Sequence, residues 1–280
     1  MKKITLIGVG LIGTSLIASL KRKGLVDFVT GIDPNAEHLH HAQSLLDDAQ
    51  TELSQESLLA DMIIIATPVG IVSNILKELA KFSLNRTIIT DVGSTKRTIL
   101  QAYQKYLPHH FSYCVAAHPI AGSERHGSLA AQENLFDGKK IIICPHEQQN
   151  EASLQMVQQM WEATGAEIIH MNADEHDGVF AHVSHMPHLL AYAFMQTILQ
   201  SPNRETLLRL AGSGFRDFTR IAASHPDIWT DIAFNNTSAI LNELKKYRDE
   251  IEQLISMIQT QDQQQLHDYL QQAHQLRSQW

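Results

Sequence analysis

The chain has 280 residues, of which 44% are hydrophobic and 19% are charged, and its formal net charge is −8. This composition is typical of a folded protein with room for two domains, and it excludes an intrinsically disordered chain. The acidic balance and the lack of a long basic run exclude nucleic acid as an expected partner. The apolar start at residues 4–7 is too short for a signal peptide or a membrane span, so we expect no membrane partner.

A glycine-rich turn follows the first apolar run and precedes a helical pattern, which indicates a strand, a tight turn and a helix. Gly8 permits the turn, Gly10 lets the backbone approach a pyrophosphate, and Gly13 lets the helix pack close to the strand. Leu11 and Ile12 lie where the helix begins, and the free N–H groups and positive dipole end of that helix attract phosphates. These five residues predict a dinucleotide-binding turn.

A second predicted strand at residues 28–32 is followed by Asp33, twenty residues after Gly13. A carboxylate there accepts hydrogen bonds from an adenosine ribose, and its charge repels a 2′-phosphate. The cofactor that we expect is therefore NAD rather than NADP. The alternative is a domain that keeps this fold without binding the cofactor.

Strands and helices continue to alternate to about residue 170, which predicts an α/β fold with a Rossmann-type, doubly wound and mostly parallel sheet. The further strands are predicted at 62–66, 87–90, 113–116, 141–144 and 167–169, with helices at 71–82 and 95–106. Two of these apolar runs contain the cysteines, Cys114 and Cys144. We interpret both as small core residues, which favours a reducing cytoplasm over a disulfide.

Three of the strands end in polar or glycine-bearing loops, at Thr67-Pro68, Ser94 and His118, and ligands bind at this carboxyl edge of open α/β sheets. Histidine changes charge near neutral pH, so His118 is suited to take a proton from a hydroxyl while a hydride leaves the same carbon. The Ser94 hydroxyl could bond both His118 and a substrate oxygen. It could equally cap the helix that follows, and Asp91 and Thr95 compete for that position.

Strand signals stop after Met171, and the remaining chain predicts helices broken by short turns. We therefore expect a cofactor-binding domain at residues 1–171 and an all-α domain at residues 172–280. Apolar residues at alternating spacings of four and three along residues 240–258 form a coiled-coil-like seam. The helix that carries this seam packs either on the rest of its domain or on a second subunit.

Three histidines, His182, His185 and His188, recur at a spacing of three residues, which by itself would favour a metal site. However, Pro187 interrupts the pattern, and the chain has no His-Glu-x-x-His motif. We therefore expect no metal. The alternative is that these histidines, with Ser184, form the wall of a polar pocket.

Arg216 and Arg220 follow a glycine-rich entry and lie four residues apart, which places them on one face of a predicted helix. Arginine makes forked contacts with carboxylates, so the pair could clamp an anionic substrate. The alternative is a surface network in which one arginine pairs with Asp217 or Asp227.

With these motifs, the chain resembles the prephenate dehydrogenase family of tyrosine biosynthesis over nearly its whole length. Besides the glycine turn, the resemblance rests on DVGSTK at 91–96, HPIAG at 118–122, SHMPH at 184–188 and GFRDFTR at 214–220. It implies an NAD-dependent oxidative decarboxylation of prephenate to 4-hydroxyphenylpyruvate, by a homodimer that forms through the helical domain. It leaves no room in this chain for the chorismate mutase or regulatory domain that some relatives carry.

The resemblance also implies roles for individual residues. His118 would accept the proton of the ring hydroxyl as a hydride passes to NAD, and Ser94 would hold His118 and the hydroxyl in register. Arg220 would bind a substrate carboxylate, with Arg216 nearby as a second cation. The pocket would be formed by Ser184, His185 and His188, with Glu124 at its rim and Trp229 closing it.

Three other functions compete with this interpretation. Arogenate, or both substrates, would undergo the same chemistry, and no single residue separates them. Another β-hydroxyacid or imine dehydrogenase with a helical dimer domain would rely on a catalytic lysine in that domain, and no lysine lies between Lys140 and Lys245. A cofactor-binding regulator without catalysis would bind NAD but form no NADH.

Overall fold

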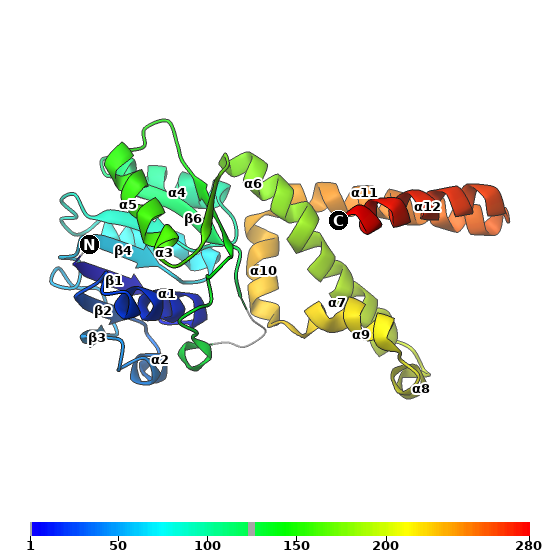
Figure 1. Ribbon diagram of the computed structural model, residues 1–280, viewed down its shortest axis with the longest axis horizontal. Helices are drawn as coiled ribbons and strands as arrows, with labels where there is room; N and C mark the ends of the chain where they lie inside the picture. The colour runs from blue at the N-terminus through cyan, green and yellow to red at the C-terminus, as the bar shows by residue number, and fades with distance from the viewer. Residues whose placement is uncertain (1, 123–126) are drawn as a thin grey trace.

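The computed structural model describes residues 2–122 and 127–280. Figure 1 shows an α/β half that contains the N-terminus and an elongated helical half, in which helices α11 and α12 project side by side away from the sheet. Within the described residues, no helix is both long enough and apolar enough to cross a membrane.

A single sheet forms the centre of the α/β half, with the strand order β3-β2-β1-β4-β5-β6-β7-β8. Neighbouring strands are parallel except β6 and β7, which are antiparallel. This arrangement confirms the predicted mostly parallel sheet. The strands are β1 (Lys3–Ile7), β2 (Phe28–Ile32), β3 (Asp48–Gln50), β4 (Met62–Ile65), β5 (Ile88–Asp91), β6 (Cys114–Pro119), β7 (Lys140–Cys144) and β8 (Glu167–His170).

Two features of the sheet differ from the sequence prediction. Strand β3 was not predicted, because its three residues, Asp-Ala-Gln, carry no apolar alternation. Strand β7 runs antiparallel to β6, since no α-helix lies in the described part of the connection between them to return the chain to the opposite edge of the sheet.

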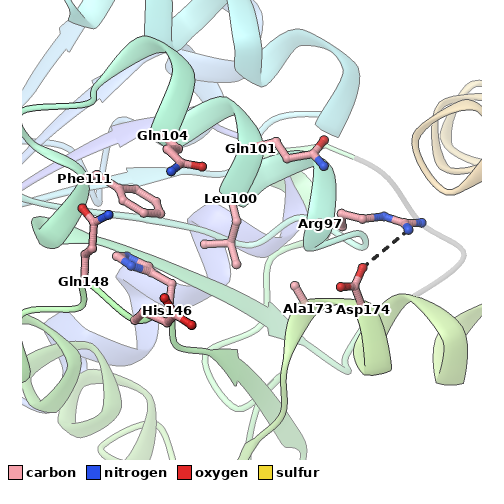
Figure 2. Close-up of a pocket in the computed structure, with 10 residues that line it drawn as sticks. Arg97, Leu100, Gln101, Gln104, Phe111, His146, Gln148, Ala173 and Asp174 are labelled. Atoms are coloured by element: carbon pink, nitrogen blue, oxygen red, sulfur yellow. Dashed lines mark ion pairs between the residues drawn. The ribbon is translucent and has the colours of Figure 1, made fainter.

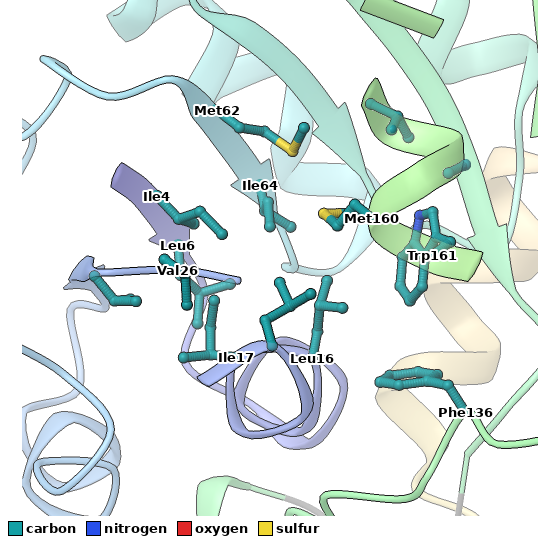
Figure 3. Packing of buried hydrophobic residues seen from close by; sticks show 14 of the residues in the cluster. Ile4, Leu6, Leu16, Ile17, Val26, Met62, Ile64, Phe136, Met160 and Trp161 are labelled. Atoms are coloured by element: carbon teal, nitrogen blue, oxygen red, sulfur yellow. The ribbon is translucent and has the colours of Figure 1, made fainter. Parts of the chain in front are cut away.

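Helices cover both faces of the sheet, and alternate residues of each strand supply the two cores. Ile64 faces a core that includes α1 and α5, whereas its neighbours Ile63 and Ile65 face a core that includes α3 and α4. Figure 3 shows the first core, where Leu16 and Ile17 of α1 pack near Ile4 and Ile64. The helices of this half are α1 (Leu11–Arg22), α2 (Ala36–His41), α3 (Val69–Leu79), α4 (Arg97–Tyr106) and α5 (Glu151–Glu162).

The second core also contains both cysteines. Cys114 and Cys144 are fully buried and free, as the apolar runs predicted. Each fully buried aliphatic side chain in these cores contributes roughly 1.5–3 kcal/mol to stability. The sheet that carries the loops is therefore a rigid support.

The helical half begins with one continuous rod. Helix α6 (Ala173–Phe180) passes through a π-helical turn (Ala181–His185) into α7 (Met186–Leu199). Pro187 lies in the first turn of α7, where its missing N–H is tolerated, so it does not end the rod. The remaining helices are α8 (Arg204–Arg209), α9 (Ser213–Thr219), α10 (Pro226–Asn235), α11 (Thr237–Gln259) and α12 (Gln263–Gln279), with a 3₁₀ turn at Arg220–Ala223.

The predicted seam lies on α11, and its two ends have different surroundings. Ile240 is buried, and Leu244 packs on the small core of the helical half. Further along the helix, Tyr247, Ile251 and Ile258 are exposed. The start of the seam therefore packs on its own domain, and the rest presents an apolar face.

Two carboxylates of the helical half cap helices of the α/β half. Helix α3 has no side-chain cap of its own, and its Gly70 N–H donates to Asp231 Oδ1 on α10 at 2.8 Å. Helix α4 also lacks a local cap, and Asp177 on α6 accepts from its first N–H groups. An acceptor at a helix N-terminus satisfies unpaired N–H groups and opposes the helix dipole. These two contacts join the halves.

Gly70 leaves room for the cap from Asp231, because a Cβ at this position would overlap Asp231 Oδ1. We expect Gly70→Ala to lower the free energy of unfolding by about 1–2 kcal/mol, the usual value of a lost N-terminal cap. In an Asp231→Ala background the same change should be neutral or slightly stabilising, since alanine is favoured over glycine in helices. Urea unfolding of the four proteins measures the coupling, and an equal cost in both backgrounds would contradict it.

Candidate active site

The glycine turn after β1 has the shape that a dinucleotide needs. Gly8 has a φ of +93°, and a Cβ there would lie 2.7 Å from the carbonyl oxygen of Ala66. A Cβ on Gly13 would lie 2.8 Å from the Gly8 carbonyl oxygen, so this glycine lets α1 approach the turn. The space beside Gly10 is open within 4 Å. Because Gly10 has no side chain, its backbone is accessible at the point where a pyrophosphate would approach.

Helix α1 begins directly beyond this turn at Leu11 and Ile12, and Gly10 provides no side-chain cap for it. Its first N–H groups are therefore suited to a phosphate. Asp33 follows β2 and is 7% exposed, and its carboxylate accepts from the Val9 N–H at 2.8 Å. This contact ties the carboxylate to the glycine turn.

Thr67 and Pro68 link β4 to α3, at the same edge of the sheet as the glycine turn. Thr67 is half-buried and Pro68 is exposed. They lie beside the glycine turn, since a Cβ on Gly8 would lie 2.7 Å from Thr67 Cγ2.

His118 belongs to β6 itself, whereas the sequence pattern ended the strand at residue 116. The strand continues to Pro119 because antiparallel pairing with β7 extends it, and His118 is opposite Ile142. The side chain is 9% exposed and lies 4.9 Å from the ring of Phe180. Strand β6 is parallel to β5, so His118 lies at the carboxyl edge where the cofactor turn also lies.

A chain of buried groups leads from His118 to the start of α4. His118 Nδ1 lies 2.8 Å from His176 Nε2, and His176 Nδ1 lies 2.8 Å from Asp177 Oδ1. The Asp177 carboxylate also accepts from the N–H groups of Lys96 at 2.8 Å and Arg97 at 3.1 Å. The sequence did not assign a role to Asp177, because its partners lie about 80 positions away in the chain.

These contacts shift the pKa values of the groups in the chain. Burial alone would raise the pKa of Asp177, but the hydrogen bonds from His176 and from the two backbone N–H groups lower it overall. Burial lowers the pKa of His118 well below its ordinary value, and electrostatic interactions with His176, Lys96 and His185 add to this effect. His118 is therefore a neutral imidazole near pH 7, as a proton acceptor must be.

A buried ion pair fixes the loop between β5 and α4. The Lys96 ammonium is fully buried, and it donates to the Asp91 carboxylate and to the carbonyl oxygen of Ala117 at 2.6 Å. Asp91 also accepts from the Gly93 N–H at 2.8 Å. This pair holds the loop with Ser94 beside the residue that precedes His118. The motif at 91–96 did not by itself predict that Lys96 is buried, because its partners Asp91 and Ala117 meet it only in the folded protein.

Ser94 is half-buried in this loop, at the same edge of the sheet as His118. The alternative in which Ser94, Asp91 or Thr95 caps α4 is wrong, because Asp177 from the helical half satisfies the first N–H groups of that helix. Among the described residues, His118 Nδ1 bonds to His176 rather than to Ser94. A role for Ser94 toward a substrate stays a prediction.

His185 and His188 lie on the rod and face neighbouring groups of the helical half. His185 is buried, and its Nδ1 lies 3.2 Å from the Nδ2 of Asn236, which also donates to the Asp177 carbonyl oxygen. Asn236 therefore donates to His185 Nδ1, which leaves the proton of a neutral His185 on Nε2. Burial lowers the pKa of His185 to about 4.

His188 donates from Nδ1 to the Ser184 carbonyl oxygen at 2.8 Å, and its ring stacks on Trp229 at 3.7 Å. Burial lowers the pKa of His188, and the positive charge of Arg220 lowers it further. Ser184, His188 and Trp229 are thus in contact, and the turn that begins at Arg220 packs on α7. His185 connects this group with the chain behind His118, because its ring lies 6.4 Å from that of Trp229 and Asn236 joins it to Asp177.

Arg216 is not brought into this group. Arg216 is exposed on α9, which ends at Thr219, so Arg220 begins the following 3₁₀ turn instead of sharing the helix as predicted. In the described part of the chain, Arg216 forms no ion pair with Asp217 or Asp227. Glu124 lies outside the described residues.

The described residues contain no cluster of three or more histidine, cysteine or acidic side chains that could hold a metal ion. Instead, the three regularly spaced histidines have separate partners, and His182 pairs with Glu243 at 2.7 Å.

A surface pocket of about 280 Å³ lies on another side of α4. Figure 2 shows Arg97 and Asp174 at one end of it, as an ion pair of 3.5 Å, and Phe111 and His146 at the other. None of the predicted site residues lines this pocket. It is separate from the group around His118.

Comparisons with known proteins are consistent with both halves of the chain. Residues 16–170 match the family "Prephenate dehydrogenase, nucleotide-binding domain", and residues 172–272 match "Prephenate dehydrogenase, dimerization domain". A prephenate dehydrogenase of Bacillus subtilis is 34% identical over 274 residues, which cover 96% of this chain and 74% of the relative.

Two solved structures cover nearly the whole chain. Prephenate dehydrogenase from Aquifex aeolicus, in complex with hydroxyphenyl propionate and NAD+, is 30% identical and has a TM-score of 0.92. The match covers 100% of this chain and 98% of the Aquifex aeolicus chain. Arogenate dehydrogenase from Synechocystis has a TM-score of 0.82 and 30% identity, and covers 99% of both chains.

The buried histidines make the folded state sensitive to acid. His118, His176 and His185 have pKa values below the ordinary 6.5, mainly because of burial. Above pH 6.5 both states leave these groups neutral, but below it the unfolded chain binds protons that the folded chain does not. We expect the free energy of unfolding to fall between about pH 6.5 and 4, by up to about 1.4 kcal/mol per pH unit for each histidine.

Urea unfolding at several pH values across this window measures the slope. His185→Asn should reduce it, whereas replacement of His274, which is exposed on α12, should not. A free energy of unfolding that stays constant from pH 7 to pH 5 would contradict the expectation.

Proposed function

The chain belongs to the prephenate dehydrogenase family, and from that premise we propose that it is an NAD-dependent prephenate dehydrogenase. In the proposed reaction, prephenate and NAD give 4-hydroxyphenylpyruvate, carbon dioxide and NADH. The observation that carries the proposal is the position of His118. It is a buried, neutral histidine at the cofactor edge of the sheet, and its Nδ1 is bonded to His176, so Nε2 is the nitrogen that meets a substrate.

The turn after β1 supports NAD as the cofactor. Gly8, Gly10 and Gly13 would receive the pyrophosphate, and Asp33 would accept hydrogen bonds from the adenosine ribose and repel a 2′-phosphate. The Aquifex aeolicus relative is described with NAD+ bound, which agrees with this choice. Bound NAD would supply the acceptor for the hydride. Leu11, Ile12, Thr67 and Pro68 would line its site.

His118 would act as the base. Its Nε2 takes the proton of the ring hydroxyl while the hydride leaves the same carbon, which becomes a ketone. The bond between the ring and its carboxylate then breaks, carbon dioxide leaves, and the electron pair enters the ring. The oxygen regains a proton from His118, so the ring ends as a phenol and the base is restored. Ser94 would hold the hydroxyl beside His118.

The group around Arg220 would bind the carboxylates of the substrate. Arginine binds carboxylates in a forked geometry, and a chain of net charge −8 needs such a local cation to attract a dianion. His185 would donate from Nε2, while Ser184 and His188 would line the wall. Trp229, with its indole N–H buried and without a partner among the described residues, would close the site. Arg216 would be a second cation nearby, and Glu124 is the residue that the family resemblance implies at the rim.

Arogenate is the second candidate substrate, because the Synechocystis relative is named an arogenate dehydrogenase at the same 30% identity as the Aquifex aeolicus prephenate dehydrogenase. Arogenate carries an amine where prephenate carries a ketone, so the ring chemistry assigned to His118 is the same for both. An enzyme that accepts both substrates is compatible with the same site.

We also propose that the protein acts as a homodimer through its helical half. The matched family name for residues 172–272 and the exposed apolar face of α11 at Tyr247, Ile251 and Ile258 support this assembly. The buried free thiols of Cys114 and Cys144 support a reducing, cytoplasmic location.

NADH absorbance with prephenate and with arogenate, each with NAD and with NADP, tests the proposed reaction. We expect turnover of prephenate with NAD, and a fall in kcat/KM at acid pH because His118 must be neutral. The pH at which kcat/KM falls should lie below 6.5, the ordinary pKa of histidine, since burial lowers the pKa of His118. His118→Asn should lower kcat by a factor of about 10²–10⁴ while NAD still binds. If neither substrate is turned over, the proposed reaction fails, and a cofactor-binding regulator without catalysis is the function that remains.

Arg220→Gln tests the carboxylate site. The change removes the charge but keeps a hydrogen-bonding side chain, so we expect KM for prephenate to rise by about 10–100-fold, the equivalent of a lost charged hydrogen bond. NAD affinity should stay unchanged. Arg209→Gln, on exposed α8, is a matched control that should leave KM as in the wild type. An unchanged KM for Arg220→Gln would refute the role of Arg220.

A further inference from the structure

The chain of hydrogen bonds behind His118 ends at the Asp177 carboxylate, which can only accept hydrogen bonds. Both oxygens of Asp177 receive backbone N–H groups, from Lys96 and Arg97, and Oδ1 also faces His176 Nδ1. The carboxylate is 1% exposed and His176 is fully buried, so water does not substitute for these partners. An ionised carboxylate has no proton to donate, and His176 Nδ1 must therefore carry the hydrogen of that contact.

The proton on His176 Nδ1 determines where the proton of His118 must be. A neutral histidine with a proton on Nδ1 has a lone pair on Nε2, so His176 accepts from His118 at their 2.8 Å contact. His118 must then carry its own proton on Nδ1, and its Nε2 is left with the lone pair. The N–H groups at the start of α4 hold Asp177 as an acceptor, and this sets the direction of the bonds from His176 to Asp177 and from His118 to His176.

We propose that His176 and Asp177 are positioning residues that hold His118 in the tautomer with a free lone pair on Nε2 and stabilise its charge when it takes a proton. The inference rests on the proposed function of His118 as a base, and it adds two residues that do not touch the substrate. The second part of the role follows from the charges nearby. Lys96 is matched by Asp91, which leaves Asp177 as the carboxylate hydrogen-bonded into the histidine chain.

A purely structural role is the competing explanation, because Asp177 also caps α4. The protein contains a comparison for this role. Asp231 caps α3 from the same helical half, with a hydrogen bond to the Gly70 N–H at 2.8 Å. No histidine lies behind that cap among the hydrogen bonds of the described residues. Asp231→Asn and Asp177→Asn thus make the same chemical change at two helix starts, and only one of them carries the chain to His118.

Asp177→Asn removes the negative charge at the end of the hydrogen-bond chain. The single asparagine oxygen should stay at the Oδ1 position, because Lys96 N–H and His176 Nδ1 both donate there and an NH₂ in its place would face the Lys96 N–H. His176 and His118 therefore keep their protons on Nδ1, but the carboxylate that stabilises a protonated His118 is lost. We expect kcat to fall about 10²–10⁴-fold with KM and NAD affinity within about threefold of the wild type. Asp231→Asn should keep kcat within a fewfold.

Nitrogen NMR of ¹⁵N-histidine-labelled protein without substrate measures the tautomer directly, and signals are assigned by their loss in His118→Asn and His176→Gln. In the wild type at neutral pH we expect a protonated Nδ1 and an unprotonated Nε2 on both residues, and the same tautomers in Asp177→Asn, where only the charge is lost. A wild-type His118 protonated on Nε2 overturns the proposal, as does Asp177→Asn with the kcat of Asp231→Asn.

The two measurements separate this inference from the proposed function. If neither prephenate nor arogenate is turned over, the function fails, but the wild-type tautomer still decides whether the chain is oriented as proposed. If Asp177→Asn does not fold, the wild-type spectrum and the kcat of His176→Gln, expected to fall while NAD affinity is kept, decide it.

Discussion

The Asp177 carboxylate at the start of α4 is the contact on which the arrangement of the site depends. It comes from the helical half and satisfies N–H groups of the α/β half, so it fixes how the two halves meet. The same side chain ends the hydrogen-bond chain to His118, and the backbone oxygen of the same residue receives Asn236, which orients His185. A single residue therefore connects His118 with a second buried histidine, His185.

Burial makes these contacts effective, because a buried polar group without a partner destabilises the fold. Removing one member of a buried ion pair typically costs 3–5 kcal/mol, and the Lys96–Asp91 pair is buried directly behind His118. The alternatives in which Lys96 leaves the loop or His118 rotates away are thus high in energy. The site is held in shape by the same contacts that hold the fold, and Asp231 at α3 makes a second connection between the halves.

Much of the α/β half was predictable from the chain. Apolar runs located all the strands except β3, and the glycine spacing located the turn that Gly8 and Gly13 form by close contact with their neighbours. These features depend on residues a few positions apart, and their signals are local. The errors had a different origin. The end of β6 and the orientation of β7 depend on pairing between strands, and the cap of α4 comes from a residue about 80 positions away.

The sequence by itself determined the two-part architecture and the positions of the glycine turn, Asp33 and His118 near the ends of strands, because local periodicity and spacing carry that information. Tertiary structure alone decided which partner each site residue has. It placed His176 and Asp177 behind His118, buried Lys96 against Asp91, stacked His188 on Trp229, and put the exposed Arg220 in a turn that packs on α7. The reason is physical: a hydrogen-bond direction or a pKa shift depends on burial and on neighbours in space, and neither is a property of nearby positions in the chain.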